Sequence, residues 1–165
     1  MLVEPPTRDE LVSVALAMRH RDLLEMQALL GTEGRFPTAE ALVARWEPIL
    51  PHMFCAKLPG EPIAVGAVVL PRRNVASIGM VATGRFNRVA IDLTRFLLRR
   101  LFPALRAEGV HRIECMSMAG HEEVHRWLRI LGLREEGRLR GYGSNGEDFH
   151  SFGWVQDARK AGRRG

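Results

Sequence analysis

Apolar residues recur at helical spacing over the first third of the chain. Thr7 and Glu10 have the form of a capping box, and the apolar positions that follow it predict a helix that begins near Asp9. The segments 22–30 and 38–46 keep the same periodicity and are bounded by glycine and proline, so they predict two more short helices. The amino-terminal third is therefore predicted to be helical.

The pattern then changes to short apolar and β-branched runs separated by turns. The runs 53–57, 63–70 and 75–81 follow one another closely and predict three adjacent antiparallel strands. An amphipathic stripe over 88–102 predicts a long helix, which Pro103 should kink or end.

The last third alternates a strand, a helix and a hairpin. The run 110–116 predicts a strand, and because a helical crossover leads into it, this strand should be parallel to the one before. A short helix is predicted over 121–131, and a closing hairpin over 133–142 and 149–155. The order predicts a mixed α/β (α+β) domain over 1–156, with a mostly antiparallel sheet flanked by helices.

Basic residues are in excess. The chain has 24 Lys and Arg against 19 Asp and Glu, a formal net charge of +5, which favours anionic partners in general. Part of the excess lies in 157–165, which is predicted to be a basic flexible tail. Aromatic residues make up 7% of the chain and do not interleave with basic ones, so we do not expect a nucleic-acid partner. The arginines of the long helix are interpreted as a solvated face: Arg95, Arg99, Arg100 and Arg106.

The composition is typical of one globular domain. Hydrophobic residues account for 46% of the 165 positions, enough to fill one core. No apolar run reaches the ~18 residues of a membrane span, and the amino end lacks the form of a signal peptide. We therefore expect a cytoplasmic protein without a membrane partner. Cys55 and Cys115 each lie in an apolar run, which favours buried free thiols over a disulfide or a metal pair.

A zinc-protease pattern occurs once. His121, Glu122 and His125 match His-Glu-x-x-His, in which two imidazoles one helical turn apart bind zinc beside a general base. A third ligand on a following element is needed, and the closing hairpin offers only Glu147 or His150. Gly120 also places His121 in the first helical turn rather than in mid-helix. We therefore expect no metal and keep a zinc metallopeptidase as a minor alternative.

The stretch between the third strand and the long helix carries a family resemblance. Ile78 to Val81 leads through Gly84 to Ala90 into the helix, and this order resembles the GNAT family of N-acetyltransferases over nearly the whole chain. The segments 112–114 and 127–133, together with His121, resemble the family's second signature.

Two finer resemblances lie nearer the ends. The segment 136–140, followed by Asp148 and Phe149, resembles the closing hairpin of the family's ribosomal-protein acetyltransferases. The segment 18–25, taken with Trp127 and Leu128, resembles a divergent branch that contains internal virion proteins of short-tailed phages.

The GNAT resemblance implies acetyl-CoA as co-substrate, held where the parallel central strands splay apart. A helix-opening loop offers N–H groups and a positive dipole end to a pyrophosphate. In the family this loop reads Arg/Gln-x-x-Gly-x-Gly/Ala; Arg85 fills the first position and Ala90 the last, whereas Arg88 replaces the middle glycine. The expected cofactor-binding residues are Met80, Val81, Ala82, Gly84, Arg85, Phe86, Asn87, Arg88, Val89, Ala90 and His121.

Acyl transfer to an amine also needs a base, because an ammonium with a pKa near 10 must lose a proton before it attacks. Glu114 is the only carboxylate in its strand and is the predicted base; the alternative is a surface Glu114 paired with Arg112. The family often places a tyrosine acid where this chain has Leu128, so Tyr142, the only tyrosine, is the remaining catalytic candidate.

The predicted function is an N-acyltransferase that moves an acetyl group from acetyl-CoA to an unidentified amine. The competing hypothesis is a binding or structural protein that keeps the fold without turnover, associated with a virion if the phage resemblance holds. GNAT relatives are often dimers, so the resemblance also makes a homodimer a possible assembly.

Overall fold

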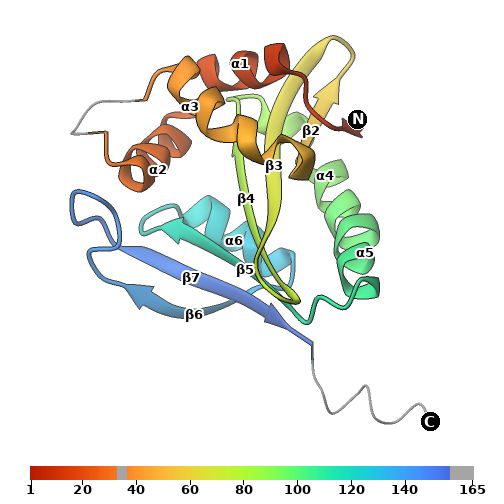
Figure 1. Ribbon diagram of the computed structural model, residues 1–165, viewed down its shortest axis with the longest axis vertical. Helices are drawn as coiled ribbons and strands as arrows, with labels where there is room; N and C mark the ends of the chain where they lie inside the picture. Colours follow the sequence, from red (N-terminus) through yellow and green to blue (C-terminus); the bar gives the residue numbers. More distant parts are fainter. Residues whose placement is uncertain (33–36, 157–165) are drawn as a thin grey trace.

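A seven-stranded sheet organises the chain, whose computed structural model describes residues 1–32 and 37–156. The strands lie in the order β1-β2-β3-β4-β5-β7-β6, and every neighbouring pair is antiparallel except β4 and β5 (Figure 1). The predicted mixed α/β class is confirmed, whereas the predicted tail 157–165 lies outside the described residues. The strands are β1 (Leu2–Glu4), β2 (Met53–Leu58), β3 (Glu61–Arg72), β4 (Val75–Ala82), β5 (Arg112–Met118), β6 (Arg134–Leu139) and β7 (Phe149–Val155).

Helices cover both faces of this sheet. In Figure 1, α1 and α3 lie at the top of the view, and α4 and α5 lie along its right-hand side. None of the helices in the described ranges is long and apolar enough to cross a membrane. The helical segments are α1 (Arg8–Leu16), α2 (His20–Leu30), α3 (Ala39–Trp46), η1 (Glu47–His52), η2 (Phe86–Arg88), α4 (Ala90–Phe96), η3 (Leu97–Leu101), α5 (Phe102–Ala107) and α6 (Glu122–Ile130).

The amino-terminal segment agrees with the sequence in its helix and departs from it in one strand. The Glu10 N–H donates to the Thr7 hydroxyl at 3.2 Å, and the Thr7 N–H donates to the Glu10 carboxylate at 2.9 Å, which completes the predicted capping box. The strand β1 was not predicted, because three residues are too few for a strand periodicity. It pairs antiparallel with β2.

Of the two effects predicted for Pro103, a kink or an end of the long helix, the end is not observed. Helical backbone continues from Ala90 to Ala107, because α4 passes through the π-helical turn η3 into α5, whose second residue is Pro103. Proline removes a backbone donor and crowds the preceding turn. A single π turn just before it shifts the hydrogen-bond ladder and lets the helix absorb the proline.

Each face of the sheet buries its own apolar cluster. The helices α1 and α3 pack with β2, β3 and β4 on one face, and α4, α5 and α6 pack with β2 to β5 and β7 on the other. Burying a side chain of the size of Leu or Phe contributes about 1.5 to 3 kcal/mol. The largest fully buried side chains include Leu11 and Leu42 on the first face and Leu93, Ile113 and Phe152 on the second.

The parallel strands β4 and β5 diverge after a short paired stretch. Val75–Ser77 pairs in register with Arg112–Glu114, and no further pair between these strands follows in the described part of the chain. Beyond this point β4 stays paired with β3 as far as Ala82, and β5 stays paired with β7 as far as Met118. The sheet is therefore split into two halves, which is the splayed central pair that the resemblance implied.

Candidate active site

The gap between the diverging strands opens into a cavity of about 280 Å³. It passes through the plane of the sheet: Phe54 and Leu97 in its lining belong to the core under α4 and α5, whereas Met26 and Ala67 belong to the core under α1 and α3. The lining is mostly apolar. Its polar members are Arg19, Asp22, Glu25, Ser77, Ser117, His121 and Tyr142.

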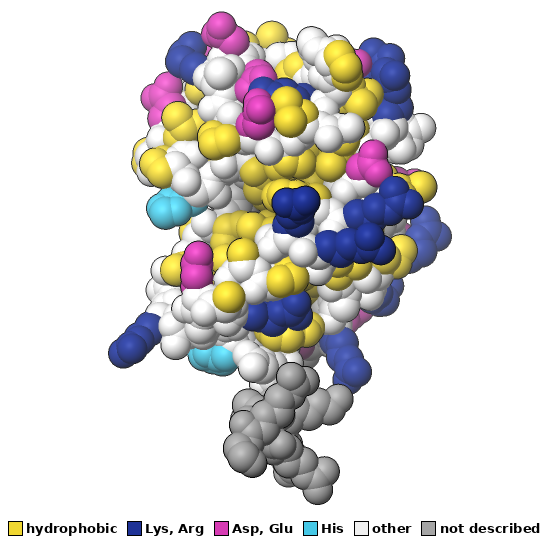
Figure 2. Space-filling model, turned by 90° about the vertical axis from the view of Figure 1, so that its right-hand side faces the viewer, with side chains coloured by type: hydrophobic (Ala, Val, Ile, Leu, Met, Phe, Trp, Pro, Cys, Tyr) yellow, Lys and Arg dark blue, Asp and Glu magenta, His cyan; other side chains and the backbone are white. Residues whose placement is uncertain are grey.

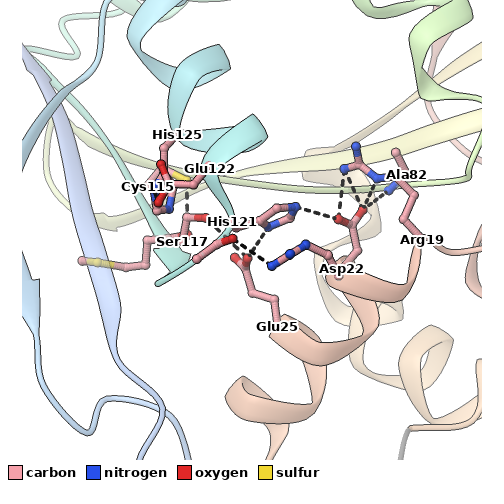
Figure 3. A network of polar contacts seen from close by, with 12 residues as sticks. Arg19, Asp22, Glu25, Ala82, Cys115, Ser117, His121, Glu122 and His125 are labelled. Atoms are coloured by element: carbon pink, nitrogen blue, oxygen red, sulfur yellow. Dashed lines mark hydrogen bonds and ion pairs between the residues drawn. The ribbon is translucent and has the colours of Figure 1, made fainter.

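Asp22, at the start of α2, is a buried carboxylate that ties this helix to the end of β4. It accepts the Ala82 N–H at 2.7 Å, and the Arg19 guanidinium donates to it through Nε at 3.1 Å and Nη2 at 2.9 Å (Figure 3). Burial raises the pKa of Asp22, and the charge of Arg19 opposes that rise. Ala82, which we predicted to bind the cofactor, therefore has its N–H already occupied by a side chain.

One turn further along α2, Glu25 meets the other half of the split sheet. Its Oε2 lies 3.1 Å from Nδ1 of His121 and 3.4 Å from the Ser117 hydroxyl. The second ring nitrogen of His121 lies 3.7 Å from Asp22 Oδ1, so the imidazole sits between the two carboxylates (Figure 3). His121, which was expected near the pantetheine arm, does line the cavity.

The helix α2 thus crosses the open end of the split sheet and is bonded to both of its halves. The Arg19 N–H donates to the Ala82 carbonyl at 2.9 Å on the β4 side. Arg21 donates to the Gly120 carbonyl at 2.8 Å on the β5 side. The sequence did not identify Asp22 or Glu25 as residues of the site. The available signal was their spacing of three residues, which puts both carboxylates on one face of the helix.

The predicted phosphate loop lies beside the cavity and does not line it. Arg85 and Arg88 are half-exposed and converge on the carboxylate of Glu61, at 2.7 and 3.5 Å. The replacement of the middle glycine by Arg88 therefore leaves the cavity unfilled. The other predicted loop residues surround these two in sequence: Gly84, Phe86, Asn87, Val89 and Ala90.

An aromatic pair joins this loop to α6. The rings of Phe86 and Trp127 meet edge to face, with centroids 5.6 Å apart, and Trp127 Nε1 donates to the Thr94 hydroxyl at 2.8 Å. Trp127 also lines the cavity, so this pair connects the loop to the cavity lining.

The two predicted catalytic residues have different surroundings. Glu114 does not line the cavity; its carboxylate pairs with Arg72 and Arg112, each at 2.8 Å, which is the structural alternative considered above. The Arg112 guanidinium also donates to the Glu136 carboxylate of β6. This contact passes over Gly153 of the intervening strand β7, where a Cβ would lie 2.6 Å from the Glu136 carboxylate. Tyr142 does line the cavity, half-exposed, with its ring 5.2 Å from that of Phe149.

A cysteine also faces the cavity without the properties of a nucleophile. Cys115 is buried, and burial raises the pKa of its thiol to about 12. Cys55 is free as well, as predicted, and burial raises the pKa of its thiol to about 11. Because the thiolate is the reactive form, Cys115 is a poor nucleophile.

The two histidines of the zinc-protease pattern lie in different environments. His121 contacts the carboxylates of α2, whereas His125 is buried between His150 and Phe152, with ring centroids 5.2 and 5.1 Å away. Within residues 1–32 and 37–156, no three His, Cys, Asp or Glu side chains form a group that could hold a metal ion. His125 Nε2 is a buried nitrogen without a hydrogen-bond partner in the same part of the chain.

His125 should make the fold sensitive to mild acid. Burial lowers its pKa, so below the unfolded value of about 6.5 the unfolded chain binds more protons than the folded one. The stability contributed by the neutral ring is complete above this pH and is lost as the pH falls. When the pH is lowered from 7.5 to 5, we expect the free energy of unfolding, measured by urea denaturation, to fall less for His125→Leu than for the parent. Equal losses would show that His125 is not the sensitive group.

Basic side chains lie beside the apolar surface on the side of α4 and α5. Figure 2 shows hydrophobic side chains gathered in the middle of this face, with Lys and Arg side chains beside them. The predicted solvated arginines of the long helix are exposed. This face therefore combines an apolar hollow with cationic surroundings.

The fold matches solved acetyltransferases over almost its whole length. The ribosomal-protein-alanine N-acetyltransferase from Brucella melitensis matches with a TM-score of 0.64 at 17% identity, covering 94% of this chain and 99% of that one. Ard1 from Thermoplasma volcanium gives 0.69 at 14%, covering 94% and 97%. A GNAT superfamily phosphinothricin acetyltransferase from Sinorhizobium meliloti, in complex with acetyl-CoA, gives 0.63 at 14%, covering 94% and 88%.

The chain therefore has the GNAT acetyltransferase fold. Comparisons of its sequence with protein-family models and with curated proteins give no match. The resemblance of its amino end to phage virion proteins, the homodimer and the cytoplasmic location stay predictions.

Proposed function

We propose that the chain is an N-acyltransferase that uses acetyl-CoA and a primary amine. The observation that carries this proposal is the cavity at the β4–β5 split, whose lining includes residues from the apolar clusters on both faces of the sheet. A cavity that crosses the sheet in this way has room for a thioester and an amine to meet. The solved acetyltransferases with acetyl-CoA bound support the same choice of co-substrate.

The edge of β4 beyond Ser77 is the proposed docking line for the pantetheine arm. It has no strand partner on the side of β5 in the described residues, so its backbone groups on that side, apart from those of Ala82, can pair with the amides of an extended ligand. The Met80 N–H lies on the same edge as the Ala82 N–H and would polarise the thioester carbonyl. Such a donor typically contributes about 2.7 to 4 kcal/mol to transition-state stabilisation.

The loop Gly84–Ala90 is the proposed site of the diphosphate. Arg85 and Arg88 already converge on one carboxylate, Glu61. A diphosphate would take the place of that carboxylate as their anionic partner, in charge-assisted and bidentate contacts.

The acid for the departing thiolate is proposed to be Tyr142, because its side chain lines the cavity. Leu128, at the family's tyrosine position, is buried and apolar and cannot donate a proton. A thiolate leaves without strong acid assistance, so Tyr142→Phe should slow the reaction rather than abolish it.

The charge of Arg88 provides the test of this function. Calorimetric titration with acetyl-CoA should give one site per chain. Arg88→Glu should lower the affinity for acetyl-CoA about tenfold, or about 1.4 kcal/mol. Arg99→Glu, which makes the same charge change at an exposed position of η3, beyond α4, should bind like the parent.

The same protein is then assayed for acetyl-CoA-dependent release of free thiol with a panel of primary amines. Amine-dependent release supports the function. No heat at millimolar acetyl-CoA, together with no thiol release for any amine, would contradict it and leave only the fold.

A further inference from the structure

The α2 end of the cavity differs in chemistry from the rest. Glu25 and His121 meet there, and the apolar side chains of Met26 and Leu29, with the ring of Tyr142, complete this end of the lining. The loop that carries Tyr142 is joined to α2 by a hydrogen bond of 2.8 Å from the Ser144 N–H to the Ala28 carbonyl. The α2 end is therefore a small apolar chamber with a carboxylate in its wall.

The charges of this chamber select against an anionic ligand. Arg19 is the one Lys or Arg among the cavity-lining residues that the structure describes. Its guanidinium is held by Asp22 through Nε and Nη2 and lies 4.9 Å from the centre of the Phe86 ring. No cation of the described lining is thus left for a carboxylate or phosphate on the ligand. Glu25 supplies a negative charge in the same space, with 15% of its side chain exposed.

We infer that this chamber binds the acyl acceptor, and that the acceptor is a small primary amine with an apolar body and no acidic group. The inference rests on the proposed function and names its second substrate. The ammonium would lie on the Glu25 carboxylate, which His121 and Ser117 hold in place. The apolar body would pack on Met26, Leu29 and the ring of Tyr142.

This position makes Glu25 the catalytic base in place of Glu114. The ammonium gives one proton to the Glu25 carboxylate, and the neutral nitrogen attacks the thioester carbonyl carbon. The C–N bond forms as the C–S bond breaks. The Tyr142 hydroxyl gives its proton to the departing thiolate, which leaves as free CoA thiol, and takes up the nitrogen's excess proton in its place. Glu25 then returns its proton to water, so the overall reaction releases one proton for each amide formed.

The test compares two acceptors and one isosteric variant. With saturating acetyl-CoA, kcat/KM should be at least about a hundredfold higher for 2-phenylethylamine than for L-glutamate, whose amine carries acidic groups. Glu25→Gln keeps an oxygen for His121 and Ser117 but cannot take a proton. It should lower kcat/KM for 2-phenylethylamine about a hundredfold, the usual size of a general-base effect, with unchanged affinity for acetyl-CoA.

Glu40→Gln is the matched control, because Glu40 is an exposed glutamate on α3 outside the cavity. It should behave like the parent in every assay. Thermal melts of both variants show whether each is folded, and the acceptor preference of the parent tests the inference even if Glu25→Gln does not fold.

The outcomes separate this inference from the proposed function. Acetyl-CoA binding and turnover with a preference for L-glutamate, or a fully active Glu25→Gln, overturns the acceptor chamber and leaves the acyltransferase intact. Absence of acetyl-CoA binding overturns both. A preference for 2-phenylethylamine that depends on Glu25 supports both.

Discussion

Replacing Asp22 with alanine is expected to lower the free energy of unfolding by about 3 to 5 kcal/mol, the usual effect of removing one partner of a buried ion pair. The substitution leaves the Arg19 guanidinium without its carboxylate and the Ala82 N–H without an acceptor. It also frees α2 from the end of β4, so amine-dependent turnover should fall with stability. Urea denaturation at pH 7.5, followed by circular dichroism, measures the change.

Asp92→Ala is the control for this experiment. Asp92 also pairs with an arginine three residues away, but both side chains are at least half exposed, at 50% for Asp92 and 61% for Arg95. An exposed pair contributes only about 0 to 1 kcal/mol. If Asp22→Ala lowered the free energy of unfolding no more than Asp92→Ala does, Asp22 would not be the residue that fixes α2 to the sheet.

Filling the split between β4 and β5 is expected to weaken acetyl-CoA binding strongly while the fold survives. Gly79 lines the cavity, and a Cβ placed on it would meet no atom within 4 Å, so Gly79→Phe adds a ring to open space. Phenylalanine is also favourable in a strand. Acetyl-CoA affinity, measured by calorimetry, should fall on the order of a hundredfold, or about 2.7 kcal/mol.

The same substitution in another strand distinguishes filling of the cavity from a general loss of fold stability. In β6, a Cβ on Gly137 would approach only the Ser151 hydroxyl, at 3.9 Å, and Gly137 does not line the cavity. Gly137→Phe should therefore bind acetyl-CoA like the parent. Equal binding by Gly79→Phe and the parent would place the cofactor elsewhere.

The fold was predictable because local patterns and tertiary contacts agree over most of the chain. The capping box at Thr7, the strand runs of β2 to β4 and the crossover into β5 each have a local signature that the structure keeps. The exceptions are β1, which exists only through its pairing with β2, and Pro103, which a π turn accommodates. Both depend on neighbours that a local pattern does not contain.

The candidate site was less predictable, because burial decides which polar residue matters. Strand alternation placed Glu114 and Arg112 on one face, and the structure pairs them there, outside the cavity. Asp22 and Glu25 have the pattern of an ordinary solvated helix face. They become buried or nearly so only because α2 spans both halves of a sheet that splits far away in sequence.

Backbone amide chemical shifts test most directly whether acetyl-CoA lies in the split between β4 and β5. On titration of ¹⁵N-labelled protein with acetyl-CoA, we expect the largest shifts at Ile78–Val81 and Cys115–Ser117, with smaller ones at Gly84–Ala90. No shift at millimolar acetyl-CoA, or shifts confined to residues outside the cavity and the loop, would contradict this location of acetyl-CoA.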